Sequence, residues 1–288
     1  MSARRRQRRA QLVASFLSNA TAVTGATITL IVLLAALPGA ALMPYGPSEA
    51  DFFNILSPPS WSHPFGTDSF GRDVLTRVLY GARVSLMVSA AGVAMAAIVG
   101  TAAGMVSAYK SGFTDLLVMR LADLLFAFPA FVLALFLMVV LGFGAVNVSA
   151  AIALTYFPLF ARLARNTTLL LREEPYVQAA RLMGQSTPRI LVGEILPNIA
   201  APLIVQATIG VAFGIIIEAG LSFLGVGVQP PTPSLGVIMA DGREYFQRGP
   251  WVLTMTGVAI SIALLGLNLF GDGVRDLMDP RLRQRAGQ

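Results

Sequence analysis

Long apolar stretches separated by short polar segments dominate the chain. Six of them reach or approach the length of about 20 residues that crosses a bilayer core, and they cover residues 20–43, 84–109, 116–141, 146–161, 200–224 and 251–270. The second is the clearest, because no charged residue lies between Arg83 and Lys110. The fourth is the weakest, since it is short and contains Asn147 and Pro158. The pattern predicts an all-α membrane protein with six transmembrane helices.

Basic residues are distributed unevenly over the connecting segments. If both termini face the cytoplasm, sixteen of the 21 lysines and arginines lie inside, and only five lie outside: Arg72, Arg77, Arg83, Arg243 and Arg248. Cytoplasmic segments of membrane proteins carry the excess of positive charge. The distribution therefore predicts cytoplasmic N and C termini. The net charge of +6 reflects this topology and gives no single basic patch for nucleic acid.

The spans divide the chain into five parts. A basic cytoplasmic tail (1–19) precedes a first membrane anchor (20–43) and an external segment (44–83), which are followed by a five-helix transmembrane domain (84–274) and a second cytoplasmic tail (275–288). A cleavable signal peptide is the alternative interpretation of the N-terminus, given the basic residues before the first span. The apolar run exceeds the roughly 7–15 residues of a signal sequence, which favours an uncleaved anchor.

The second half of the external segment has helical periodicity. Ser69 is placed to cap a short helix with Val74 and Val78 on its apolar side, and Asp73 and Arg77 have the spacing of an ion pair. We expect an amphipathic helix along the outer membrane boundary.

Small residues recur at every fourth position in the second span, where a neighbouring helix can approach closely: Gly92, Ala96, Gly100 and Gly104. Gly210 and Gly214 repeat this arrangement in the fifth span. Both stripes predict close packing between helices.

Asp123 and Glu218 are the acidic residues most nearly within spans. Charged groups at this depth usually face a bundle interior or a water-filled cavity, so both are candidates for the substrate pathway. Asp123 also has a structural alternative, because Arg120 lies three residues before it. Glu218 has no basic neighbour at helical spacing and is the better pathway candidate.

Residue types exclude several kinds of chemistry. The chain has no cysteine, one lysine (Lys110) and one histidine (His63), so a phosphate-binding Gly-Lys-Ser/Thr loop and thiolate or multi-histidine metal sites are absent from the sequence. A lone histidine is more often structural than catalytic. We expect a subunit that is not an enzyme.

Residues 173–197 form a charged segment between long apolar runs. Glu173, Glu174 and Pro175 suit the start of a helix, and Gly184 is placed to end it. Thr187 and Pro188 then suit the start of a second helix. Within the first helix we expect an apolar stripe opposite Gln178 and Arg181, made of Tyr176, Ala179, Ala180 and Met183.

This segment resembles the "EAA" loop of the membrane subunits of bacterial ATP-binding-cassette importers. The resemblance rests on the spacing of Ala179, Ala180, Gly184, Leu196 and Pro197. Two positions depart from the family pattern. Gln178 stands where the family has glutamate, and Glu194 stands where it has isoleucine.

Three further segments resemble the dipeptide/oligopeptide/nickel branch of these permeases. They are residues 63–86, with His63, Gly66, Thr67, Asp68, Gly71, Arg72 and Asp73; residues 218–251, with the run Gln-Pro-Pro-Thr-Pro; and residues 268–283. Together the matching stretches extend over nearly the whole chain after about residue 25.

The resemblance implies a type I importer permease fold in the bacterial inner membrane. It also implies four kinds of partner: a homologous permease, two cytoplasmic ATPase subunits, an external substrate-binding protein and lipid. ATP and magnesium would be bound by the ATPases, so this chain would need no cofactor. The residues expected to couple it to the ATPases are Glu173, Glu174, Gln178, Ala179, Ala180, Gly184, Leu196 and Pro197.

Other functions stay open. An ion-coupled secondary transporter is the leading alternative, although the sequence has no internal repeat and few intramembrane charges. A membrane scaffold without substrate flux is a third class. Among importers, the sequence leaves peptides, nickel chelates, glutathione and opines as possible substrates.

Overall fold

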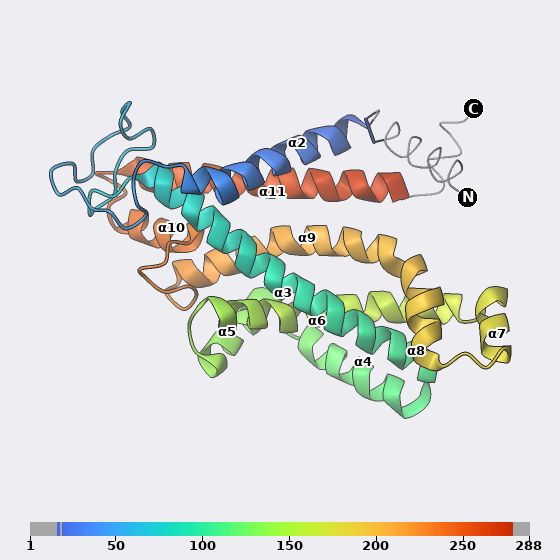
Figure 1. Cartoon of the computed structure of the whole chain (residues 1–288). Helices are drawn as coiled ribbons and strands as arrows, with labels where there is room; N and C mark the ends of the chain where they lie inside the picture. The colour runs from blue at the N-terminus through green and yellow to red at the C-terminus, as the bar shows by residue number, and fades with distance from the viewer. Residues whose placement is uncertain (1–15, 18, 279–288) are drawn as a thin grey trace.

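The computed structural model describes residues 16–17 and 19–278, and every regular element among them is a helix (Figure 1). The predicted basic tail 1–19 therefore lies almost entirely outside the described residues, and the predicted tail 275–288 is described only as far as residue 278.

Twelve elements follow one another along the described chain. They are α2 (Ala20–Leu34), η1 (Ala35–Gly39), α3 (Val74–Lys110), α4 (Gly112–Phe126), α5 (Ala130–Leu141), α6 (Ala145–Leu171), α7 (Pro175–Leu182), α8 (Thr187–Ile190), η2 (Leu191–Ile195), α9 (Leu196–Phe223), α10 (Leu235–Glu244) and α11 (Pro250–Met278).

Five helical stretches among the described residues are long and apolar enough to cross a membrane. The third predicted span, 116–141, is instead divided into α4 and α5, which meet at an angle of 97°. Pro129 explains the break, because it has no N–H for a continuous helix and disfavours helical geometry at the residue before it. The prediction of six spans holds only if this bent pair is counted as one.

The most extensive helix contact among the described residues is between α3 and α6, and it is close. A side chain at Gly100 would lie 2.9 Å from the main-chain oxygen of Phe157, and one at Gly104 would collide with the oxygen of Ala161. The small-residue stripe therefore allows the two backbones to approach, as predicted. The stripe in α9 has the same role, since Gly210 packs on Val93 of α3.

The external segment differs from the prediction. No separate amphipathic helix forms, because Val74 begins α3 itself and is fully buried. The N-cap is Asp73 and not Ser69: its carboxylate accepts from the Thr76 N–H at 2.8 Å and from His63 Nδ1 at 2.9 Å. His63 is buried, which agrees with a structural role.

Arg77 also has other partners than the expected Asp73. It lies 3.4 Å from Asp68 and 3.3 Å from Asp241 of α10, and Arg72 contacts the same two carboxylates. Four charged side chains thus join the external segment to a helix that follows Ser234 and that the sequence did not predict. Their mutual pairing explains how Arg77 can be only 2% exposed.

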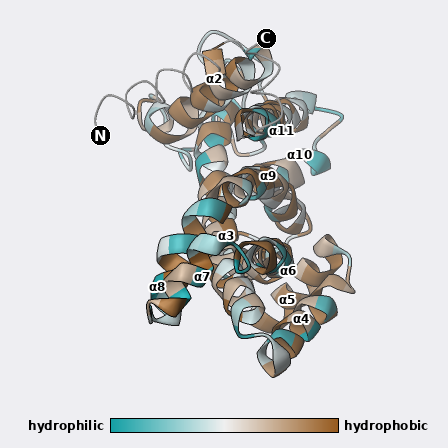
Figure 2. Cartoon of the chain, turned by 90° about the vertical axis from the view of Figure 1, so that its right-hand side faces the viewer, coloured by the Kyte–Doolittle hydropathy of each residue, from teal (hydrophilic) through white to brown (hydrophobic). Residues whose placement is uncertain are grey.

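Apolar side chains cover much of the outer surface of the bundle. Ile98 of α3 and Val139 of α5 are 72% and 73% exposed in the isolated chain. Figure 2 views the chain from the end that carries α7 and α8, where hydrophilic turns are interspersed among the hydrophobic helices. The start of α2 and the end of α11 lie toward this same end (Figure 1).

Candidate functional site: the α7–α8 segment

The first helix of the segment begins and ends as the sequence predicts. Pro175 occupies the first turn of α7 after Glu174, and both acidic residues before it are exposed. At the other end Gly184 has φ +74°. The N–H of Gln185 donates to the Ala180 oxygen and that of Gly184 to the Arg181 oxygen, which is the glycine-terminated Schellman arrangement.

The second helix is continuous with a membrane span. Its N-cap is Ser186, one residue earlier than predicted, and α8, η2 and α9 together form one helical stretch from Thr187 to Phe223. Leu196 and Pro197 lie inside this stretch, directly after the π-helical η2 and at the beginning of α9. The fifth span therefore begins well before the predicted residue 200, and the segment is its extension.

The buried face of α7 differs from the predicted stripe. Val177 and Ala180 are buried, whereas Tyr176, Ala179 and Met183 are exposed. The buried pair packs in a cluster that joins α3, α6, α8, η2 and α9: Met105, Ala164, Val177, Ala180, Ile190, Leu191, Ile195 and Ile199. Periodicity alone did not distinguish the two faces, because apolar residues occupy both.

A network of hydrogen bonds also holds α7 against the bundle. Gln178 Nε2 donates to the main-chain oxygen of Arg172 at 3.0 Å, while Arg172 Nη1 donates to the Ala108 oxygen and to Ser111 Oγ, both at 2.7 Å. Arg172 Nε also donates to Glu173 at 2.9 Å. Gln178, Arg172 and Glu173 therefore connect α7 with the ends of α6 and α3. Sequence reasoning missed Arg172, whose partners lie more than 60 residues away.

A second contact stiffens this end of the bundle. Arg165 of α6 forms two hydrogen bonds with Asp115 of α4, at 2.6 and 2.7 Å, and Ser107 of α3 donates to the same carboxylate. Paired guanidinium–carboxylate bonds fix orientation as well as distance. Three spans are thus braced next to the α7–α8 segment. This site was also absent from the sequence-based expectations.

The outward face of the segment is apolar and unoccupied within the described chain. Leu182 is 88% exposed, Met183 72%, Val192 61% and Tyr176 39%. Tyr176, Leu182 and Met183 lie at helical spacing around Ala179 on α7, whose opposite face is buried, and Val192 belongs to η2. An apolar surface on a polar segment is typical of a protein–protein contact.

The two predicted pathway residues lie in different surroundings. Asp123 is about half exposed and pairs with Arg162 of α6 at 2.7 Å, more closely than with the expected Arg120 at 3.8 Å. Glu218 is fully buried, and its Oε1 accepts from Ser222 Oγ at 2.7 Å. Among the described residues no cluster of three or more His, Asp or Glu side chains could hold a metal ion.

Comparisons with known proteins place the chain in a family. Residues 100–284 match the family described as "Binding-protein-dependent transport system inner membrane component". The chain is 40% identical to the dipeptide transport system permease protein DppC of Alkalihalophilus pseudofirmus, over 92% of this chain and 87% of that protein. It is 44% identical to a putative peptide transport system permease of Brucella suis, over 90% and 87%.

A third relative and a solved structure also resemble this chain. The glutathione transport system permease protein GsiD of Escherichia coli is 39% identical over 91% of this chain and 87% of its own length. A chain from inward-facing structures of the MetNI methionine ABC transporter matches with a TM-score of 0.53 and 20% identity, over 70% of this chain and 96% of that chain. The fold is therefore that of an importer transmembrane subunit, and the chain belongs to the binding-protein-dependent inner membrane components, the permease subunits of ATP-binding-cassette importers.

Proposed function

We propose that this permease forms, with a homologous permease, the transmembrane pathway of an importer for short peptides or glutathione-like solutes. The related DppC and GsiD proteins, named for dipeptide and glutathione transport, support this class of substrate. Family membership agrees with two expectations from the sequence: the chain is a non-catalytic inner-membrane subunit, and it carries no cofactor.

Two cytoplasmic ATPase subunits would drive the pair, each gripping one α7–α8 segment. The observation that carries this proposal is the contrast between the two faces of α7. Val177 and Ala180 are packed into the bundle, while Leu182 and Met183 project from it as an apolar surface. A partner that covers this surface would exclude water from large apolar side chains, each worth roughly 1.5–3 kcal/mol when fully buried.

Movement of α7 would reach the spans by two routes. The cluster around Val177 and the hydrogen bonds of Arg172 connect it to the ends of α3 and α6. The continuous helix from α8 into α9 provides the second route. Because packed interfaces shift between discrete arrangements, closure of the ATPases would reorient the spans as rigid bodies. Asp123 stays a candidate for the pathway on its half-exposed face of α4.

Cysteine cross-linking tests the docking surface directly, since the chain has no cysteine of its own. We expect Leu182→Cys or Met183→Cys to form a disulfide with a cysteine placed in the ATPase cleft. Phe53→Cys on the external segment is the matched control, because Phe53 is 100% exposed. It should react with an impermeant reagent added to spheroplasts and form no bond with the ATPase.

The reverse labelling pattern would overturn the proposed orientation. If Gln185→Cys were labelled from outside intact spheroplasts, the segment would face away from the ATPases. Uptake that survives loss of the ATPase subunits and collapses with a protonophore would instead support an ion-coupled secondary transporter.

A further inference from the structure

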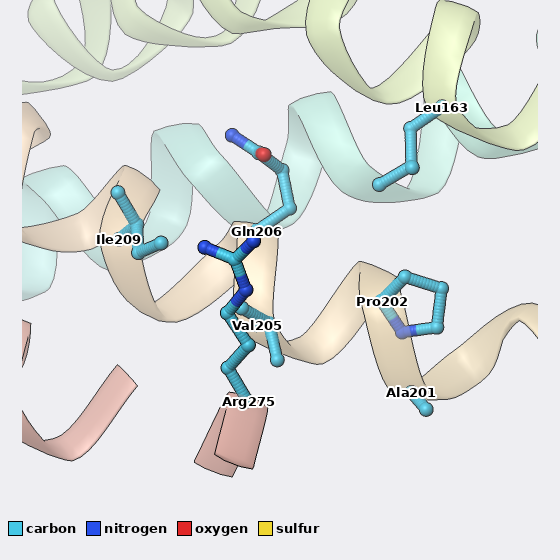
Figure 3. A pocket seen from close by; sticks show the side chains of 7 residues that line it. All are labelled: Leu163, Ala201, Pro202, Val205, Gln206, Ile209 and Arg275. Carbon is cyan, nitrogen blue, oxygen red and sulfur yellow. The ribbon is translucent and has the colours of Figure 1, made fainter. Parts of the chain in front are cut away.

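A cavity of about 440 Å³ lies between α6, α9 and α11 (Figure 3). Leu163 of α6 lines one wall, and Val205 and Ile209 of α9 contribute to another. Two polar side chains reach this largely apolar space from different helices. They are Gln206 of α9 and Arg275 of α11, whose guanidinium group extends across to α9 in Figure 3.

Neither of these polar groups has a partner in the described part of the chain. No hydrogen bond or ion pair joins the side chain of Arg275 or Gln206 to another described residue, and the neighbouring Asp276 carboxylate accepts from Asn19 Nδ2. No acidic side chain lines the cavity. A guanidinium stays charged at all physiological pH values, so the cavity has a net positive charge.

The cavity lies toward the half of the molecule that carries the α7–α8 segment. Arg275 is close to the end of α11 at Met278, and that end of α11 lies on the same side as α7 and α8 (Figure 1). The side chains of Pro202, Gln206 and Ile209 recur at helical spacing and form one cavity-facing stripe of α9. Polar groups in membrane-spanning helices usually face a water-filled cavity or another protein surface and avoid lipid.

Such a largely apolar cavity with a few convergent polar groups is the usual form of a small-molecule site. A guanidinium matches a carboxylate through two parallel N–H bonds. A glutamine amide offers both a donor and an acceptor, which are the two groups of a peptide bond. Arg275 and Gln206 therefore complement the end of a peptide, where a carboxylate follows an amide.

We propose that this cavity is a transit site that holds the carboxylate end of the substrate on the cytoplasmic side of the pathway. This inference rests on the proposed function, because peptides and glutathione share a carboxylate beside an amide whatever their side chains. Recognition of that common group would suit a pathway that passes different sequences. In this site Arg275 binds the carboxylate of the substrate, and Gln206 binds the adjacent peptide bond.

Binding to the whole importer without nucleotide or binding protein tests the site. The complex is embedded in nanodiscs of zwitterionic lipid, and trialanine and trialanine amide are titrated with detection by saturation-transfer NMR. Loss of one charge-assisted pair should weaken binding about tenfold. We expect the wild type to bind trialanine about tenfold more tightly than the amide, and Arg275→Ala to bind both as weakly as the wild type binds the amide.

Two further variants separate recognition from folding. Arg275→Lys keeps the charge but loses the planar fork, so an intermediate preference is expected. Gln206→Leu should weaken both ligands equally, because both contain the peptide bond. Arg248→Ala removes an exposed arginine elsewhere in the chain and should bind as the wild type does. Equal binding of acid and amide by the wild type, or an unchanged preference in Arg275→Ala, would overturn the proposal.

A lipid phosphate is the other anion that could reach Arg275, and repeating the titration in nanodiscs with phosphatidylglycerol distinguishes it. Binding of trialanine in both lipids supports the substrate site. Absence of trialanine binding together with an Arg275-dependent rise in thermal stability from phosphatidylglycerol would overturn it in favour of a lipid site. ATP-driven uptake with the binding protein is measured separately, so failure of peptide import and failure of this site are told apart.

Discussion

The Gln178 side chain donates a hydrogen bond to the main-chain oxygen of Arg172 at 3.0 Å, which connects the exposed helix α7 to the end of α6. This bond requires an N–H donor, so an ionised glutamate at the position could not form it. The departure from the family pattern at Gln178 therefore accompanies a specific contact. Arg172 continues the connection to Ala108 and Ser111 at the end of α3.

Gln178→Leu should loosen this connection without unfolding α7. The lost hydrogen bond is worth about 1 kcal/mol, while Val177 and Ala180 keep the helix packed. We expect more ATP to be hydrolysed for each substrate molecule taken up, as measured in proteoliposomes with the complete importer. A ratio identical to that of the wild type would show that the connection does not contribute to coupling.

Gly184 variants distinguish backbone strain from steric fit at the ATPase. A left-handed conformation costs an L-residue roughly 1–2 kcal/mol, and asparagine tolerates it best. Nothing lies within 4 Å of a Cβ at this position, so space within the chain is not limiting. We expect Gly184→Asn to transport best of the three variants, Gly184→Ala to transport less, and Gly184→Val to transport least. If the bulky asparagine instead impaired uptake as much as valine, contact with the ATPase would be the cause.

Glu218 variants test whether this acid organises the end of α9 or serves the pathway. Its Oε1 accepts from Ser222, and Ser222 Oγ accepts in turn from the Val228 N–H at 3.0 Å. Glu218→Gln keeps an oxygen acceptor, so uptake should be preserved. Glu218→Ala leaves Ser222 without its acceptor and should lower thermal stability, with a free-energy loss of about 1–3 kcal/mol. Complete loss of uptake in Glu218→Gln would favour the pathway role.

Asp241 should make stability depend on pH. Burial raises the pKa of this carboxyl, and attraction to Arg77 and Arg72 opposes the rise without cancelling it. With a folded-state pKa above the unfolded value, the folded state binds the proton more tightly, so acidification through that window stabilises it relative to the unfolded state. The side-chain amide of the Asp241→Asn variant cannot titrate. The melting temperature of Asp241→Asn minus that of the wild type should therefore be highest at pH 7 and fall toward pH 4.

A constant difference between Asp241→Asn and the wild type over that range would contradict this prediction. It would mean that Arg72 and Arg77 fully compensate the burial of the carboxylate. Glu49→Gln, on the exposed part of the external segment, provides a matched comparison for the loss of one negative charge.

Local features of the sequence were sufficient for the outline of the fold. The apolar lengths predicted the spans, the small residues of α3 predicted close packing against another helix, and Gly184 predicted the end of α7. These features act within one helix or one turn, so neighbouring residues determine them. Pro129 causes the break between α4 and α5. The sequence prediction used hydropathy averaged over residues 116–141, which does not detect a break at one proline.

Which neighbour covers each helix face was decided only by the tertiary structure. The sequence predicted an apolar stripe of α7 through Tyr176, whereas packing of α7 on the bundle buried Val177 and left Tyr176 exposed. The predicted ion pair between Asp73 and Arg77 does not form. Asp73 is hydrogen-bonded to His63, and Arg77 pairs with Asp68 and with Asp241, which is 164 residues away. Spacing along a helix determines which side chains share a face, but the energy of burying them depends on what packs there. The convergence of Arg275 and Gln206 on one cavity has the same origin, since no local rule brings α11 beside α9.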